Sequence, residues 1–305
     1  MIRRPILGAL AALALFAWAP PAAAAEKLNV VTTTSLYADL VRQIAGDAVE
    51  VRYVAPPKFN IHYIQPKPSD VRNVRRADLF VQSGLDHEHW TDPLLQAAGR
   101  TELFRGSVRN ADMSTGITLL EVPQGQVDRM EGDIHLFGNP HFYVGPQNVP
   151  AMTATLLGKL KELDPDNAAA YDTNAAAFLE KFTARLAEWK TSAEKTAGKE
   201  IVSYHKDIAY LADFLGVKAE QFVEPKPGIP PTPKHVGFLA GYMKERGIRL
   251  IVTPTYYPRR TAEEVAGRAG GRVAIVCQNA GEVPGTEDVF GFFDHNVKAI
   301  SEGVA

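Results

Sequence analysis

The sequence contains very little cysteine: Cys277 is the only one among 305 residues. An internal disulfide needs two thiols, so the fold must be stabilised by packed cores even in an oxidising compartment. Charge of either sign is also not in excess, with 33 basic and 35 acidic residues and a net charge of −2. Because the basic residues are dispersed, the chain lacks the electrostatic footprint of a protein that binds nucleic acid or an anionic membrane.

Long apolar runs are missing after the first 25 residues. Residues 1–25 combine Arg3 and Arg4, an apolar stretch at 6–18 and a small-residue cleavage site at 22–24, which together predict a secretory signal peptide. The apolar stretch is shorter than the roughly 20 residues that cross a bilayer. No cysteine adjoins the cleavage site for lipid attachment. We therefore expect a soluble periplasmic protein without a membrane anchor.

Apolar stretches of strand length alternate with helical patterns in both halves of the chain. Strands are predicted at residues 28–33, 49–54, 79–82, 117–122, 200–204, 217–223, 248–252 and 273–277. Helices are predicted at residues 36–46, 69–76, 88–98, 207–215, 234–246, 261–269 and 286–300. Ser35 is the predicted cap of the first helix. Strand, helix and strand at this spacing indicate parallel crossover units, so we predict an α/β protein with helices on both faces of each sheet.

One helical pattern lies between the two halves and is much longer than the others. From residue 165 to about 197, apolar residues recur at steps of three and four on one helix face: Tyr171, Ala175, Phe178, Phe182, Leu186 and Trp189. About thirty residues at 1.5 Å per residue make a rod on the order of 45 Å, roughly the span of two small lobes. We predict an N-terminal lobe at 26–148, linking helices including this strut at 149–197, and a C-terminal lobe at 198–305.

Three histidines stand where a predicted strand or the junction between the lobes gives way to a loop. His62 lies in the loop after the second strand, His141 in the junction loop before the strut, and His205 at the end of the first strand of the second lobe. Ligands of open α/β sheets bind beyond the carboxyl ends of the strands, so these loops should face one cleft. Neutral imidazole is a preferred ligand of Zn²⁺, and three imidazoles leave one tetrahedral position to fill.

The segments around these histidines are N-I-H-Y-I-Q-P-K-P-S-D at 60–70, G-N-P-H-F-Y at 138–143 and S-Y-H-K-D at 203–207. With the threonines at 32–34 and the pair Glu224-Pro225, they resemble the cluster A-I solute-binding proteins of ABC transporters, the ZnuA/TroA-like group that delivers Zn²⁺ or Mn²⁺. The resemblance covers the chain after the signal peptide. It implies a TroA-like fold in which one long helix bridges two lobes, with little hinge motion and a metal ion bound between them.

The resemblance leaves the fourth metal ligand open. The family usually supplies an aspartate from the loop after the last strand, whereas here this loop reads C-Q-N-A-G-E-V-P-G at 277–285. Gln278, Glu282 or a water molecule are the candidates. Cys277 ends an apolar strand, so we expect it to pack inward and not to bind metal.

Five further histidines are weaker candidates. His87 and His89 read as a solvated helix start, with a secondary metal-capturing patch as the alternative. His135 lies six residues before His141 and is a candidate for a flap that passes metal inward. His235 and His295 are expected at helix termini in structural roles.

The function predicted from these observations is capture of Zn²⁺ between the lobes and its delivery to a membrane permease with a cytoplasmic ATPase. Mn²⁺ is the second choice, because it prefers more oxygen ligands than three imidazoles provide. We expect a monomer that is not an enzyme. A zinc hydrolase is the alternative of another class, but the H-E-x-x-H, G-x-S-x-G and G-x-x-x-x-G-K motifs are missing from the sequence. A binding protein for an organic solute or oxyanion is a third hypothesis.

Overall fold

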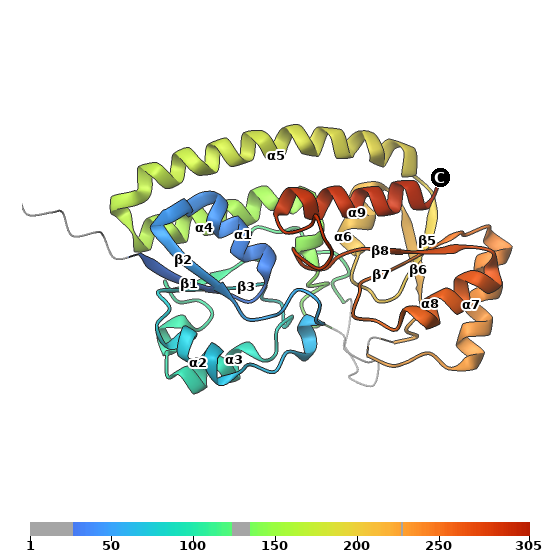
Figure 1. The fold of residues 1–305 in the computed structure, drawn as a ribbon, viewed down its shortest axis with the longest axis horizontal. Coiled ribbons are helices and arrows are strands. Elements are labelled where there is room, and N and C mark those ends of the chain that lie inside the picture. The colour runs from blue at the N-terminus through green and yellow to red at the C-terminus, as the bar shows by residue number, and fades with distance from the viewer. Residues whose placement is uncertain (1–26, 124–134, 227) are drawn as a thin grey trace, which may run out of the picture.

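The computed structural model describes residues 27–123, 135–226 and 228–305, and two α/β lobes lie side by side beneath one long helix (Figure 1). The signal peptide predicted at 1–25 lies outside the described residues. Within the described ranges, none of the helices has the length and apolar composition that spanning a bilayer requires.

Each lobe contains a four-stranded parallel sheet. The order is β2-β1-β3-β4 in the N-terminal lobe and β6-β5-β7-β8 in the C-terminal lobe, which confirms the repeated α/β architecture. The strands are β1 (Leu28–Thr32), β2 (Val49–Tyr53), β3 (Leu79–Gln82), β4 (Asn110–Asp112), β5 (Glu200–Ser203), β6 (Lys218–Phe222), β7 (Leu250–Thr253) and β8 (Arg272–Ile275). Val30 of β1 pairs with Val51 of β2 and with Leu79 of β3. The carboxyl ends of parallel strands share one edge of the sheet, where loops can gather binding residues.

Helices cover both faces of each sheet. They are α1 (Ser35–Ala45), α2 (Pro68–Arg75), α3 (Thr91–Ala98), α4 (Val149–Leu163), α5 (Ala168–Thr196), α6 (Ala209–Leu215), α7 (Pro233–Arg246), α8 (Arg259–Ala269) and α9 (Val289–Gly303). Short 3₁₀ turns are η1 (Gly46–Ala48), η2 (Ile61–Tyr63), η3 (Thr101–Leu103), η5 (Phe142–Val144), η6 (Pro146–Asn148) and η7 (Pro165–Asn167). Helices α2 and α3 pack on the outer face of the N-terminal sheet, and α7 and α8 do the same in the C-terminal lobe. The inner faces point toward α5.

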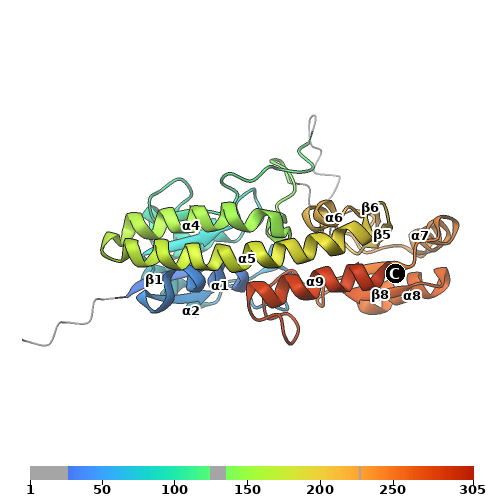
Figure 2. The same ribbon diagram turned by 90° about the horizontal axis from the view of Figure 1, so that it is seen from above.

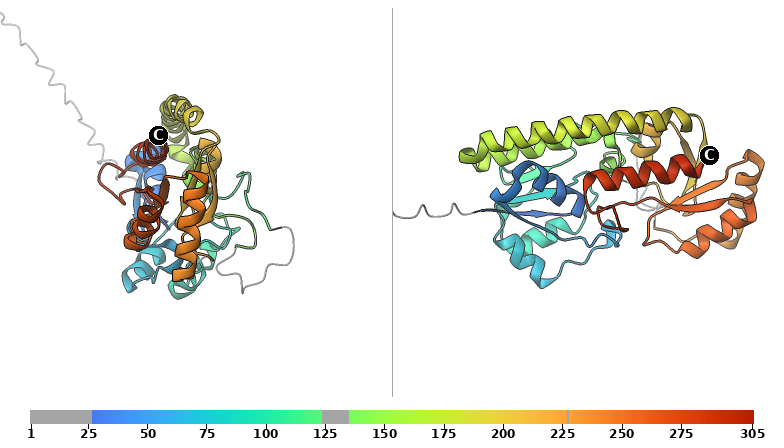
Figure 3. Two further views of the ribbon diagram at one scale, coloured as in Figure 1. Left: turned by 90° about the vertical axis from the view of Figure 1, so that its right-hand side faces the viewer. Right: turned by 45° about the horizontal axis from the view of Figure 1, so that its top comes forward.

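Helix α5 is the predicted strut, and it packs against both lobes. Figures 2 and 3 show it running beside α4 and over α9 along the length of the molecule. Asn174 donates a hydrogen bond from Nδ2 to the Ile44 carbonyl of α1 (3.0 Å), and Trp189 donates from Nε1 to Asp294 of α9 (2.8 Å). The Phe182 ring contacts the Phe293 ring at a centroid distance of 5.8 Å. The apolar face predicted from the sequence is thus divided between the two lobes.

The lobes also share one core and direct hydrogen bonds. A single apolar cluster joins α1 and β1 of the first lobe to α6, α9 and β7 of the second. Ser35 donates from Oγ to the Ala280 carbonyl (2.6 Å), and Asp39 accepts a hydrogen bond from the backbone of Val289 (2.8 Å). Opening a continuous core would expose apolar surface at a cost of about 25 cal/mol per Å². This arrangement disfavours a wide hinge motion.

Two local predictions were wrong. The strand expected at 117–122 does not form, because its apolar residues pack on the core from an irregular segment in which Leu120 pairs with Asn139 and Tyr210. The fourth strand is instead β4, at Asn110–Asp112. The cap of α1 is Thr34, whose side chain accepts from the Tyr37 amide, whereas Ser35 bonds across to the other lobe.

Candidate metal centre

Five imidazole rings gather where the loops of the two lobes meet, and we call them the histidine cluster: His62, His87, His135, His141 and His205. The His62 ring is central, with centroid distances of 4.8 Å to His87, 5.2 Å to His135 and His141, and 5.9 Å to His205. The centroids of His141 and His205 are 5.6 Å apart. Ligand atoms of His62, His135 and His141 lie within 4.8 Å of one another. The three histidines predicted from the loops are therefore neighbours in space.

The loops of His62 and His141 are built in the same way. Asn60 accepts a hydrogen bond from the His62 amide at Oδ1 (3.0 Å), and Asn139 does so for His141 (2.9 Å). An asparagine that bonds the backbone two residues ahead forms a compact turn, and each turn is followed by or contains a 3₁₀ segment. The Nε2 atoms of His62 and His141 consequently face each other at 3.3 Å.

Two of the predicted ligands are oriented through their other ring nitrogen. His205 Nδ1 lies 2.9 Å from the Glu224 carboxylate, and His141 Nδ1 lies 3.4 Å from the Tyr143 hydroxyl. Partners of this kind fix the tautomer and the direction of a metal-binding imidazole. Glu224 lies two residues after β6, the strand that pairs with β5.

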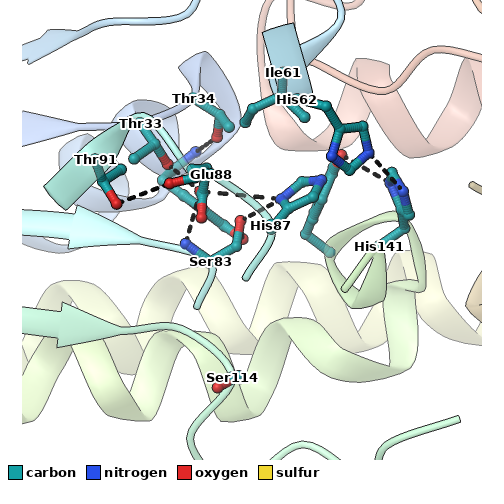
Figure 4. A network of polar contacts seen from close by, with 12 residues as sticks. Thr33, Thr34, Ile61, His62, Ser83, His87, Glu88, Thr91, Ser114 and His141 are labelled. Carbon is teal, nitrogen blue, oxygen red and sulfur yellow. Dashed lines mark hydrogen bonds and ion pairs between the residues drawn. The ribbon is translucent and has the colours of Figure 1, made fainter. Parts of the chain in front are cut away.

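His87 was expected in a solvated helix start, and that prediction was wrong. Helix α3 begins only at Thr91, and the His87 ring is completely buried. Its Nδ1 lies 3.0 Å from Ser83 Oγ, which in turn lies 2.9 Å from the Tyr37 hydroxyl. Figure 4 shows the ring between this hydroxyl network and the rings of His62 and His141. The position of His87 after β3, at the carboxyl edge of the sheet, was the signal in the sequence that could have found it.

His89 and His135 lie on the outer side of the cluster. His89 is exposed and His135 is half-buried, and their rings stack at a centroid distance of 6.5 Å. The ring of His135 also stacks on that of His62 at 5.2 Å. Imidazoles thus extend from the surface to the buried ring of His141.

The two candidate ligands in the loop after β8 are engaged in hydrogen bonds with other parts of the protein. Both carboxylate oxygens of Glu282 accept backbone hydrogen bonds, from Thr255 at 2.6 Å and from Gln278 at 2.8 Å. The Gln278 side chain accepts from the Tyr143 hydroxyl (3.5 Å) and so reaches His141 through that tyrosine. The role of either residue as fourth ligand stays a prediction. Cys277 packs in the core as expected, and burial raises the pKa of its thiol.

Three imidazoles of the cluster, those of His62, His87 and His141, favour the neutral form. Loss of hydration lowers the pKa of His62, His87 and His141 well below 6.5, and repulsion between the neighbouring rings lowers it further. A neutral imidazole has a free lone pair, which is the form that binds a metal ion. The electrostatics therefore favour cation binding without prior loss of protons.

The spacing of the rings matches the size of one tetrahedral ion. Two imidazoles that share an ion at about 2 Å place their ring centroids about 5 Å apart. The His62–His141 distance of 5.2 Å meets this value, whereas the distances of 5.6 and 5.9 Å to His205 are longer, so His205 would move inward to share the ion. The arrangement is suited to binding a divalent cation between the lobes.

The remaining two histidines bond backbone carbonyls and take no part in the cluster. His235 Nε2 lies 2.9 Å from the Phe222 carbonyl, and His295 Nε2 lies 3.0 Å from that of Ile275. Both contacts are structural, as predicted. His295 is in the middle of α9 and not at a helix terminus, so that part of the prediction was wrong.

Comparison with known proteins gives consistent matches over almost the whole chain. The sequence profile of the ZnuA family, described as zinc-uptake complex component A, periplasmic, matches residues 30–303. The iron-binding protein YfeA of Yersinia pestis is 26% identical over 292 residues, covering 93% of this chain and 88% of YfeA. The high-affinity zinc uptake system protein ZnuA of Bacillus subtilis is 24% identical over 254 residues, covering 82% of this chain and 78% of that protein.

The solved structures agree on the fold. A crystal structure of ZnuA superposes with a TM-score of 0.75 at 23% sequence identity, covering 91% of this chain and 97% of the other. At this identity the likeness supports the arrangement of two lobes and a long helix, and it does not bear on the metal.

Proposed function

This chain belongs to the ZnuA family of periplasmic zinc-uptake components, and we propose that it captures Zn²⁺ between its lobes and delivers it to an ABC-transporter permease. The proposed ligands are His62, His141 and His205. The permease would work with a cytoplasmic ATPase. We further propose that the exported protein is a monomer in the periplasm.

The observation that carries the choice of zinc is the donor set. The ligand atoms of His62, His135 and His141 that lie within 4.8 Å of one another are all imidazole nitrogens. Two of the nearby carboxylates hold other groups: Glu224 faces His205, and Glu88 accepts from Thr33 and from the Ser83 amide. Nitrogen ligands favour Zn²⁺, whereas Mn²⁺ prefers oxygen. Mn²⁺ is the alternative cargo, and the iron in the name of one relative is a reason to test several metals.

The rigid connection between the two lobes is compatible with a protein that binds and delivers a small cation. The lobes share a core, and α5 bonds both of them, so large closure is not available for trapping a ligand. We infer that loops at the cluster, and not whole lobes, admit and release the ion. This rigid frame argues against a hinged binding protein for an organic solute.

A zinc hydrolase would need a general base beside an open coordination position. Glu282 and Glu88 already accept backbone and hydroxyl hydrogen bonds, so they are poorly placed to take a proton from a bound water. We therefore propose a transport role without catalysis.

The test is metal binding by the demetallated protein, purified without a histidine tag. Competition with a chromophoric chelator should show one tight zinc site and weaker binding of Mn²⁺. The triple variant His62→Ala, His141→Ala, His205→Ala should lose the tight zinc site. His235→Ala serves as a matched control outside the cluster. Tight zinc binding retained by the triple variant would refute the assignment, and preference for Mn²⁺ would change the cargo.

A further inference from the structure

We propose that His87 is an additional metal ligand, so that the N-terminal lobe supplies three imidazoles and His205 of the other lobe adds a fourth. This inference rests on the proposed function, because it concerns the same ion. The fourth ligand then comes from the turn after β3 and not from the loop after β8.

The first support is the state of the two nitrogens of His87. Nδ1 has a partner in Ser83 Oγ at 3.0 Å. Nε2 is buried and has no hydrogen-bond partner among the described residues. A buried polar atom without a partner is costly, so such an atom in a binding site suggests a missing ligand. The two nitrogens lie on different edges of the ring, so the edge not bonded to Ser83 is available to an ion.

The second support is proximity to both central ligands. The His87 centroid is 4.8 Å from that of His62 and 4.8 Å from that of His141, close to the spacing of about 5 Å that a shared tetrahedral ion requires. In Figure 4 the three rings form one group, with His87 on the side of the Ser83 network. The ring of His87 therefore lies beside both proposed ligands, on the side of the N-terminal lobe.

The third support is the backbone that presents the residue. Gly84, Leu85 and Asp86 have φ values of +80°, +56° and +58°, a left-handed run that non-glycine residues rarely adopt. The His87 amide donates to the Gly84 carbonyl at 3.0 Å and closes the turn. Strained backbone of this kind persists where the surrounding structure enforces it, and it is concentrated at functional sites. Here the turn directs into the cluster a ring that a regular helix start would leave in solvent.

The fourth support is the buried network behind the ring. Glu88 accepts hydrogen bonds from Thr33 Oγ1 at 2.7 Å and from the Ser83 amide at 2.9 Å. Ser83 Oγ then contacts both Tyr37 and His87. Ligating histidines are characteristically held through their second nitrogen by such partners. The network gives His87 the support that Glu224 gives His205.

A consequence separates this arrangement from a site of three ligands. Because His62, His87 and His141 all belong to the N-terminal lobe, they can hold an ion without His205. We expect His205→Ala to weaken zinc binding by about tenfold to a hundredfold and to keep a defined site. His62→Ala should be more damaging, because its ring lies next to every other member of the cluster.

The deciding experiment compares His87→Leu with His235→Leu, a control whose ring bonds the Phe222 carbonyl outside the cluster. Zinc affinity should fall at least tenfold in His87→Leu and change less than twofold in His235→Leu. The intense visible absorption of tetrahedral Co²⁺ should weaken in His87→Leu alone. The melting temperature of the metal-free protein should change little, because removal of the buried Nε2 that lacks a partner offsets the loss of the hydrogen bond between Nδ1 and Ser83. Should His87→Leu not fold, His87→Gln carries the same expectations for zinc and Co²⁺.

Wild-type zinc affinity and an unchanged Co²⁺ spectrum in the His87 variant would overturn this inference and leave the proposed function intact. A wild-type protein that binds no zinc would overturn both. A His87→Leu protein whose metal-free form melts well below the wild type, with its zinc affinity preserved, would assign the ring a packing role instead.

Discussion

The metal-free protein should become less stable as the pH falls below about 6.5. When the pKa of an imidazole is lower in the folded state than in the unfolded chain, the unfolded chain binds more protons. Acid then favours unfolding. Burial and mutual repulsion lower the pKa of His62, His87 and His141 in the fold. Each such group contributes about 1.4 kcal/mol per pH unit between the folded and unfolded pKa values.

Asp207 works in the opposite direction. Its burial raises the pKa of the carboxyl to about 7. Between about pH 4 and pH 7 the carboxyl is therefore protonated in the folded state and ionised in the unfolded chain, which stabilises the fold as the pH falls. Near pH 6, three imidazoles against the carboxyl of Asp207 leave a net uptake of at most about two protons on unfolding, which corresponds to at most about 3 kcal/mol per pH unit. Burial also raises the pKa of Asp39, Glu88 and Glu282, and these carboxyls reduce the slope at lower pH. The free energy of unfolding of a typical domain is about 5–15 kcal/mol, so one pH unit is a large perturbation.

Urea unfolding of the metal-free protein at pH 7.5, 6.5 and 5.5 measures this slope. Zinc-saturated protein is the control, because bound metal excludes protons from the same nitrogens and adds binding energy to the folded state. His87→Leu removes one of the three imidazoles and should roughly halve the slope. A stability that stays constant or rises between pH 6.5 and 5.5 would refute the neutral, buried state of the cluster.

Other perturbations test the supporting residues. Glu224→Gln should weaken zinc binding by about 10- to 100-fold because His205 loses its carboxylate partner, whereas Glu220→Gln, an exposed neighbour, should have no effect in the same chelator competition. Phe182→Ala should lower the free energy of unfolding by about 3–5 kcal/mol, since it empties the contact between α5 and α9; equal stability of this variant and the wild type in urea would contradict that packing. Zinc at about 1,000 times its dissociation constant should stabilise the protein by about 4 kcal/mol, and calorimetry that finds no rise in melting temperature would count against a tight site.

Much of the fold could be predicted because its strands and strut carry strong patterns. The side chains of β3 and of one face of α5 are buried, and this burial is visible in the sequence as an apolar run and as apolar residues at helical spacing. Strand β4 consists of Asn110, Ala111 and Asp112 and is held by pairing with β3, which composition alone does not reveal. The apolar residues at 117–122 show the reverse, since they bury side chains without joining a sheet.

From the sequence, only those site residues could be predicted that lie in loops at the ends of recognisable strands or at the junction of the lobes. His62, His141 and His205 were found because of where their loops begin, and the fold brings those loops together. His87 stands among Asp86, Glu88 and His89, a composition typical of a solvated segment. A left-handed turn and a buried hydroxyl network override that composition, and both depend on residues distant in sequence.

The central claim is that one zinc ion lies between the lobes in the histidine cluster. Anomalous diffraction at the zinc edge, on crystals of the zinc-loaded protein, tests it most directly. We predict one strong peak about 2.0–2.1 Å from a nitrogen of each of His62, His141 and His205. A strongest peak away from these three rings, or one that contacts only the outer pair His89 and His135, would contradict the account.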